Sequence, residues 1–103
     1  MRLHVEVTRR DIAAGRKRAC DACPIALALL RCDGISEVWV DDQISVRTRE
    51  SPFLPFTASI PPLVQEFVDR FDAGEDDLCP LTFDVDVEVD VDSDESRMGG
   101  APA

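Results

Sequence analysis

Hydrophobic and polar residues alternate in two widely separated parts of the chain. Leu3, Val5 and Val7 alternate with polar residues over positions 2–8, and the segment LTFDVDVEVDVD alternates over positions 81–92. A period of two residues is typical of a strand that buries one face. We therefore predict a first strand over 2–8 and a last strand over 81–92.

The apolar run IALALL predicts a buried helix. Pro24 precedes this run, where its missing amide costs nothing at the first helical position, and Gly34 is expected to end the helix. Because such a helix has no polar face, it must be covered from several directions or pack against a second copy of the chain. The run therefore keeps a homo-oligomer open as an interpretation.

A short helical turn is expected between the first strand and this helix. Thr8 is followed three positions later by Asp11, a variant of the capping box that begins helices. Gly15 is predicted to end the turn in a left-handed conformation.

The middle of the chain predicts a hairpin, a connection and a further helix. Two short β-rich runs, 37–40 and 44–48, place Val38, Val40, Ile44 and Val46 on one face. Four of the seven prolines fall within 51–62, which predicts an irregular connection that packs Phe53, Leu54 and Phe56 over the core. The next helix has an apolar stripe and ends at Gly74; the stripe consists of Leu63, Val64, Phe67, Val68 and Phe71.

The predicted order of elements is β-α-β-β-α-β, with the first helical part in two pieces. This order favours an α+β fold in which one antiparallel sheet lies under two main helices, as in ferredoxin-like proteins. The length of 103 residues supports one domain, which we place at 1–92. The polar, small-residue segment 93–103 is predicted to be a disordered tail.

The charge of the chain is divided unevenly along its length. The formal net charge is −10, yet residues 1–49 hold nine basic against seven acidic residues, and residues 50–103 hold two against fourteen. Net acidity disfavours direct binding to nucleic acid or to an anionic membrane. The chain also lacks a membrane-length apolar run and a signal-peptide pattern, so we expect a cytoplasmic protein with no membrane partner.

The densest positive run lies directly before the apolar helix. Five cations and one acid fall within ten residues, 9–18, and the helix directs its free amides and the positive end of its dipole at the same region. This combination is typical of phosphate sites. The candidate ligand-binding residues are Arg10, Arg16, Lys17, Arg18, Cys23 and Ile25. The alternative is that these cations pair with the chain's own acidic segment, 84–92.

The four cysteines allow three interpretations. Cys20 and Cys23 have the C-x-x-C spacing of zinc sites and of redox pairs, and the nearby cations and helix dipole would stabilise a thiolate. A zinc site would need completion by Cys79 and His4, since a continuous helix would hold Cys32 too far away. Ordinary reduced thiols are the interpretation that we favour, and we predict neither a metal nor a cofactor.

Acidic residues recur on one face of the predicted last strand. Asp84, Asp86, Glu88 and Asp90, with Asp92 after them, are candidate partner-binding residues because such a row imitates nucleic-acid phosphates. The alternative is a solvated face that prevents an exposed edge from pairing with other chains.

Catalytic motifs are absent from the sequence. It has one histidine, no tyrosine, no Gly-rich phosphate loop and neither a G-x-S-x-G nor an H-E-x-x-H motif. We therefore expect a protein that is not an enzyme.

The segments TRRDIAAG and CDACPIALALLR resemble short uncharacterised proteins of tailed phages, many from actinobacterial hosts, in which a D-I-x-x-G turn precedes a C-P-I-A-x-A-L helix. The matching residues are Asp11, Ile12, Gly15, Cys23, Pro24, Ile25, Ala26, Ala28 and Leu29. The resemblance covers about 25 residues closely and agrees elsewhere only in the order of elements. It implies a phage accessory protein in the cytoplasm of an infected host.

Two functional hypotheses follow from these features. The first is a non-catalytic counter-defence factor that sequesters a phosphorylated nucleotide signal at the basic helix start. The second is a protein-interaction module or nucleic-acid mimic that presents the acidic row to a host protein.

Overall fold

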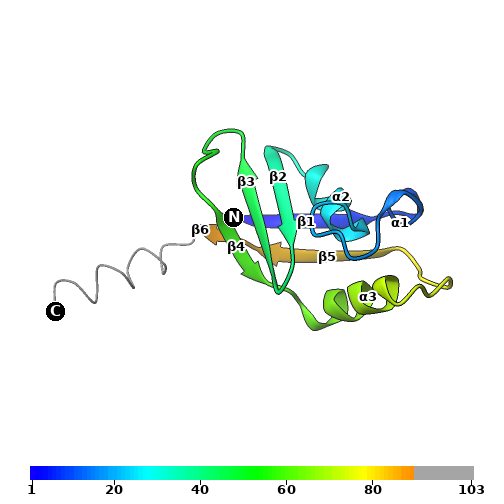
Figure 1. Cartoon of the computed structure of the whole chain (residues 1–103). Helices are drawn as coiled ribbons and strands as arrows, with labels where there is room; N and C mark the ends of the chain where they lie inside the picture. The colour runs from blue at the N-terminus through cyan, green and yellow to red at the C-terminus, as the bar shows by residue number, and fades with distance from the viewer. Residues whose placement is uncertain (90–103) are drawn as a thin grey trace, which may run out of the picture.

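The computed structural model describes residues 1–89 and has an α+β architecture with antiparallel sheets (Figure 1). Its elements in chain order are β1 (Arg2–Val7), α1 (Arg9–Ala14), α2 (Pro24–Leu30), β2 (Ile35–Val40), β3 (Gln43–Thr48), β4 (Phe56–Ser59), α3 (Pro62–Asp72), β5 (Leu81–Asp86) and β6 (Glu88–Val89). The predicted fold class is confirmed, but the ferredoxin-like order is not.

The first sheet consists of β1 and β5, which pair antiparallel. Leu3 lies opposite Val85, and Val5 lies opposite Phe83, so the apolar positions of both strands share one buried face. The alternation in the sequence predicted β1 and the first part of the last strand, β5. In Figure 1, α1 and α2 lie beside β1, whereas α3 lies beside β5.

The second sheet has the strand order β2-β3-β4-β6. The predicted hairpin forms β2 and β3, and its four apolar residues all lie on the buried face. The strand β4 was not predicted, because its segment was expected to be irregular. The prolines flank this strand instead of interrupting it, so its amides are free to pair with β3.

The predicted last strand is divided at Val87. The side chain of Val87 is fully buried, and its amide donates to the Met1 carbonyl at 2.8 Å. Asp86 therefore ends β5 beside β1, while Glu88 begins β6 opposite Thr57 of β4. The chain passes from one sheet to the other here, so two sheets replace the single sheet that we expected. Positions 90–92 and the predicted tail 93–103 lie outside the described residues.

The capping box at the start of α1 is confirmed. The Thr8 hydroxyl accepts from the Asp11 amide, and the Asp11 carboxylate accepts from the Thr8 amide at 2.8 Å. The left-handed conformation predicted for Gly15 is wrong, since its φ is −69°. Glycine is required there because a Cβ atom would lie 2.6 Å from Cδ of Pro24.

The helix α2 begins at Pro24, as predicted, but ends at Leu30 instead of continuing to Gly34. It packs against β1, β2 and α1, and most of its side chains are buried within this one chain. Intramolecular contacts therefore account for its apolar sequence, and a homo-oligomer stays a prediction.

The buried carboxylate of Asp11 joins α1 to α2. Only 3% of Asp11 is exposed, and both of its oxygens accept hydrogen bonds from the Arg31 guanidinium. Arg31 also donates to the Glu6 carbonyl on β1 at 2.7 Å. The D-I-x-x-G turn and the C-P-I-A helix are thus parts of one structural unit.

The helix α3 buries Val64, Phe67 and Phe71, as its apolar stripe predicted. Leu63 is an exception, because 61% of it is exposed. Phe53 and Leu54 were also expected to cover the core, yet they are 88% and 46% exposed. Among residues 1–89, no helix has the length and apolar character needed to span a membrane.

Candidate functional site

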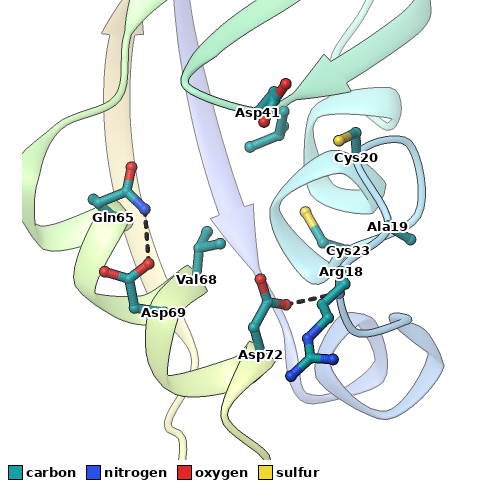
Figure 2. A pocket seen from close by; sticks show the side chains of 10 residues that line it. Arg18, Ala19, Cys20, Cys23, Asp41, Gln65, Val68, Asp69 and Asp72 are labelled. Atoms are coloured by element: carbon teal, nitrogen blue, oxygen red, sulfur yellow. Dashed lines mark hydrogen bonds between the residues drawn. The ribbon is translucent and has the colours of Figure 1, made fainter.

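A cavity of about 320 Å³ lies between the segment 15–23, here called the cysteine loop, the end of β2 and the helix α3 (Figure 2). We call it the α3 pocket. Its walls are formed by Arg18, Ala19, Cys20, Cys23, Val40, Asp41, Gln65, Val68, Asp69 and Asp72. The volume is within the range of small-ligand pockets, at the lower end.

Backbone hydrogen bonds hold the cysteine loop in place. The Arg16 amide donates to the Ala22 carbonyl at 2.8 Å, and the Cys23 amide donates to the Ala19 carbonyl at 3.0 Å. The Cys20 carbonyl in turn accepts from the Val40 amide of β2 at 2.8 Å. The loop therefore forms a fixed wall of the pocket.

Two positive residues of this loop, Lys17 and Arg18, lie at the C-terminal end of α3. The Arg18 amide donates to the Asp72 carboxylate at 2.9 Å, and Arg18 adopts a left-handed φ of 57° at this point. The Lys17 ammonium lies against Gly74, where an added Cβ atom would be 3.2 Å from Nζ. Because the C-terminal end of a helix carries partial negative charge, α3 itself supplies a negative partner for these cations.

Three carboxylates face the α3 pocket without a cationic partner. Within residues 1–89, no basic side chain forms an ion pair with Asp41, Asp69 or Asp72. Asp69 accepts a hydrogen bond from the amide nitrogen of Gln65 at 2.9 Å. Figure 2 shows Asp41 across the cavity from Asp72, and the Arg18 guanidinium directed away from Asp41 and Asp69. The pocket is therefore acidic.

The remaining lining of the pocket is largely apolar. Val40 and Val68 come from β2 and α3, and Ala19 comes from the cysteine loop. Methyl groups thus lie between the carboxylates, which is a surface suited to an aliphatic chain.

The surroundings of the two thiols in the pocket disfavour their thiolate forms. Burial raises the pKa of Cys20, and the charges of Asp41 and Asp21 raise it further. Burial also raises the pKa of Cys23, whose sulfur accepts from the Ala26 amide at 3.4 Å as the N-cap of α2. Both directions oppose the stabilised thiolate of the zinc and redox alternatives, because burial and the neighbouring carboxylates raise the pKa of the thiols.

The six predicted ligand-binding residues do not form one site. Arg18 and Cys23 line the α3 pocket, but Arg10 lines a different cavity, with Thr8 and Arg31. Arg16 and Lys17 are exposed and line none of the pockets described. Ile25 is fully buried. A phosphate at the start of α2 would therefore meet the Cys23 sulfur and three carboxylates instead of a cluster of arginines.

The predicted acidic row is partly neutralised by β1. Asp86 forms an ion pair with Arg2 at 3.1 Å, and Asp84 is bonded to His4 Nδ1 at 2.7 Å. The hydrogen bond that His4 donates to the Asp84 carboxylate raises the pKa of His4 above its ordinary value. Glu88 is exposed, and Asp90 lies outside the described residues. Among the described residues of the row, none forms an ion pair with residues 9–18, and the partners of Asp84 and Asp86 come from β1.

Sequence reasoning missed the acidic residues of the α3 pocket. Asp69 and Asp72 lie three positions apart on one helix, so their shared face could have been recognised. Asp41 directly follows β2, and only tertiary packing brings it to the same cavity as Asp69 and Asp72. Trp39, which is 54% exposed on the outer face of β2, was not singled out either.

Two further observations concern metals and the other thiols. Among the residues described, no group of three or more histidine, cysteine or acidic side chains could hold a metal ion. Cys32 lines a cavity with His4, and Cys79 lines a groove beside α3. All four cysteines are free.

Comparisons with known proteins place this chain in no family. No family model matches it, and neither a curated protein nor a solved structure is significantly similar to it.

Proposed function

We propose that this chain is a non-catalytic binding protein whose α3 pocket takes a protonated aliphatic amine. The ligand is a free diamine or polyamine, or the lysine side chain of a partner protein, since both present an ammonium group on a methylene chain. The observation that supports this proposal is the presence, within residues 1–89, of three carboxylates without an ion-pair partner on the walls of one cavity that also contains valine side chains.

Electrostatics favours a cation over the phosphorylated nucleotide that the sequence suggested. Opposite charges 4 Å apart near a protein surface attract by about 4 kcal/mol, and like charges repel by a similar amount. A phosphate in the α3 pocket would face Asp41, Asp69 and Asp72, with the Arg18 guanidinium directed elsewhere. An ammonium group at the same place would be attracted by all three carboxylates.

Aliphatic diamines match the arrangement of the walls. Asp41 and Asp72 lie on different sides of the cavity, and the side chains of Val40 and Val68 lie in its lining. A diamine extended across the pocket would place one ammonium near each carboxylate and its methylene groups against the valines. Burial raises the pKa of both thiols, so the negative charge that favours an ammonium group is assigned to the carboxylates.

Calorimetric titration with diamines of increasing length tests this proposal. We expect saturable binding that weakens as salt increases, with no binding of nucleotides to the same pocket. Nα-acetyl-lysine methylamide serves as the probe for a lysine side chain, and its relative affinity distinguishes the two ligand sources. Absence of binding by both kinds of amine would refute the proposal.

Neighbouring aspartates in one turn provide a matched control. Asp41 lines the α3 pocket, whereas Asp42 is exposed and lies outside it. The Asp41→Asn and Asp69→Asn variants should each weaken diamine binding about tenfold, which corresponds to about 1.4 kcal/mol. The Asp42→Asn variant loses the same charge and should bind like the wild type.

The origin and cellular role of the chain stay predictions. They comprise phage origin, a counter-defence role, a cytoplasmic location and a homo-oligomeric state. The alternative use of the acidic row has weaker support, because Asp84 and Asp86 already have partners on β1.

A further inference from the structure

Cys20 and Cys23 lie in a single helical turn of the cysteine loop. The Cys23 amide donates to the Ala19 carbonyl four residues earlier, and the Ala22 amide donates to the same carbonyl at 3.3 Å. Residues three apart on a helical turn have Cβ atoms roughly 5–6 Å apart. A disulfide needs Cβ atoms roughly 3.5–4.5 Å apart, so a small contraction of this turn would bring the sulfurs into bonding range.

The two thiols also share one cavity and are separate from the other cysteines. Both line the α3 pocket, and Figure 2 shows both side chains on the same wall. Cys32 lies at the far end of α2, and Cys79 follows α3. The geometry therefore offers one pair for disulfide formation.

We propose that Cys20 and Cys23 form a reversible disulfide that regulates the α3 pocket. The regulatory part of this inference rests on the proposed amine-binding function, whereas disulfide formation does not.

The reaction needs a small-molecule disulfide such as oxidised glutathione. Cys20 is half-buried and Cys23 is buried, so the Cys20 thiolate attacks first and releases one glutathione thiolate. The Cys23 thiolate then attacks the Cys20 sulfur of the mixed disulfide and releases the second. The protein loses two electrons and two protons, and one glutathione disulfide becomes two thiols.

Oxidation alters two contacts of the pocket wall. In the reduced structure, the Cys23 sulfur accepts a hydrogen bond from the Ala26 amide. The sulfur must turn away from this amide and toward Cys20 to form the disulfide. The Cys20 backbone is tied to the Val40 amide, so contraction of the turn acts on the wall next to Asp41. We therefore expect the oxidised pocket to bind diamines more weakly than the reduced pocket.

Peptide mapping after equilibration in glutathione buffers tests disulfide formation. Trypsin cleavage after Arg18 and Arg31 releases the peptide 19–31, which contains Cys20 and Cys23 and no other cysteine. We expect this peptide to lose about 2 Da on oxidation and to regain it with dithiothreitol, while Cys32 and Cys79 stay open to alkylation. The rate of disulfide formation should increase as pH rises, because the thiolate is the attacking species. Burial raises the pKa of both thiols, so little thiolate is present at low pH.

Variants separate the pair from the remaining thiols. The Cys20→Ser variant should abolish the intramolecular bond, and the Cys32→Ser, Cys79→Ser double variant should retain it. A peptide 19–31 that stays reduced, or that ends as mixed disulfides with glutathione, would overturn the proposal. A bond from either residue to Cys32 or Cys79 would do the same.

Diamine titration of the reduced and oxidised forms tests the regulation. We expect at least a threefold weaker affinity in the oxidised form. Equal affinities would refute regulation while leaving the amine site in place. A disulfide with no diamine binding in either form would refute the proposed function and the regulation, but not the redox pair.

Discussion

Removal of the Asp11 carboxylate tests whether the D-I-x-x-G turn has a structural role. In the Asp11→Ala variant, α1 loses its capping box, and the Arg31 guanidinium loses both of its carboxylate hydrogen bonds. The carboxylate of Asp11 is almost fully buried, whereas the Arg31 side chain that binds it is partly exposed. We expect this substitution to be among the most damaging polar changes in the described chain.

The magnitude follows from the contacts of Asp11. The Thr8 amide loses its acceptor, which costs about 1 kcal/mol, and hydrogen bonds to charged groups contribute about 1.5–3 kcal/mol. Breaking a fully buried ion pair costs about 3–5 kcal/mol, but the Arg31 side chain is 49% exposed and regains water. We therefore expect the free energy of unfolding to fall by about 3 kcal/mol, and Tm to fall by roughly 12 °C.

Urea denaturation followed by circular dichroism measures this loss, and the Asp42→Ala variant is the control for an exposed carboxylate. An Arg31→Met variant completes a double-mutant cycle, in which the two losses should be strongly non-additive. A loss below about 1 kcal/mol for Asp11→Ala, or additive losses in the cycle, would refute the reasoning.

The pH dependence supplies a second test of the same interaction. Burial by itself would raise the pKa of Asp11, but hydrogen bonds from Arg31 and Thr8 outweigh burial and lower it. The stabilisation is therefore fully present above the ordinary aspartate pKa and is lost as pH falls through the lowered value. The difference in unfolding free energy between wild type and Asp11→Ala should shrink below about pH 4. A difference that is constant with pH would contradict the assigned role.

Three further predictions concern packing and surface charge. The Gly15→Ala variant should reduce the free energy of unfolding by about 1–3 kcal/mol in thermal denaturation, because the new Cβ atom would lie 2.6 Å from the ring of Pro24. A variant as stable as the wild type would show that the turn can move. In urea denaturation, Phe67→Ala should reduce the free energy of unfolding by about 3 kcal/mol, because Phe67 is buried. Leu63→Ala should reduce it by under about 0.5 kcal/mol, because Leu63 is exposed. Equal losses would contradict this difference in exposure. Asp84→Asn should lower the pKa of His4, the single histidine, in an NMR titration; an unchanged pKa would exclude their hydrogen bond in solution.

Part of the candidate site was predictable from the sequence, and part was not. The C-x-x-C spacing and the neighbouring cations drew attention to the cysteine loop, which lines the α3 pocket, because both are properties of one short segment. The chemistry of the pocket was not predictable in the same way. Its carboxylates come from the end of β2 and from α3, and only packing places them opposite the loop.

The sequence by itself determined the local elements of this protein. The alternation around Val5 and Phe83, the Thr8 and Asp11 capping box and the start of α2 at Pro24 all depend on neighbours within a few residues. Backbone geometry and side-chain spacing act over that distance, so the pattern carries the information.

Only the tertiary structure decided how these elements meet. The division of the last strand depends on Val87 finding a buried place beside Met1, and β4 depends on pairing with β3. The partners of the charged residues were decided in the same way: Lys17 and Arg18 meet the end of α3, while Asp86 meets Arg2. Electrostatic interactions act through space, so the order of charges along the chain could not show which of them would become neighbours.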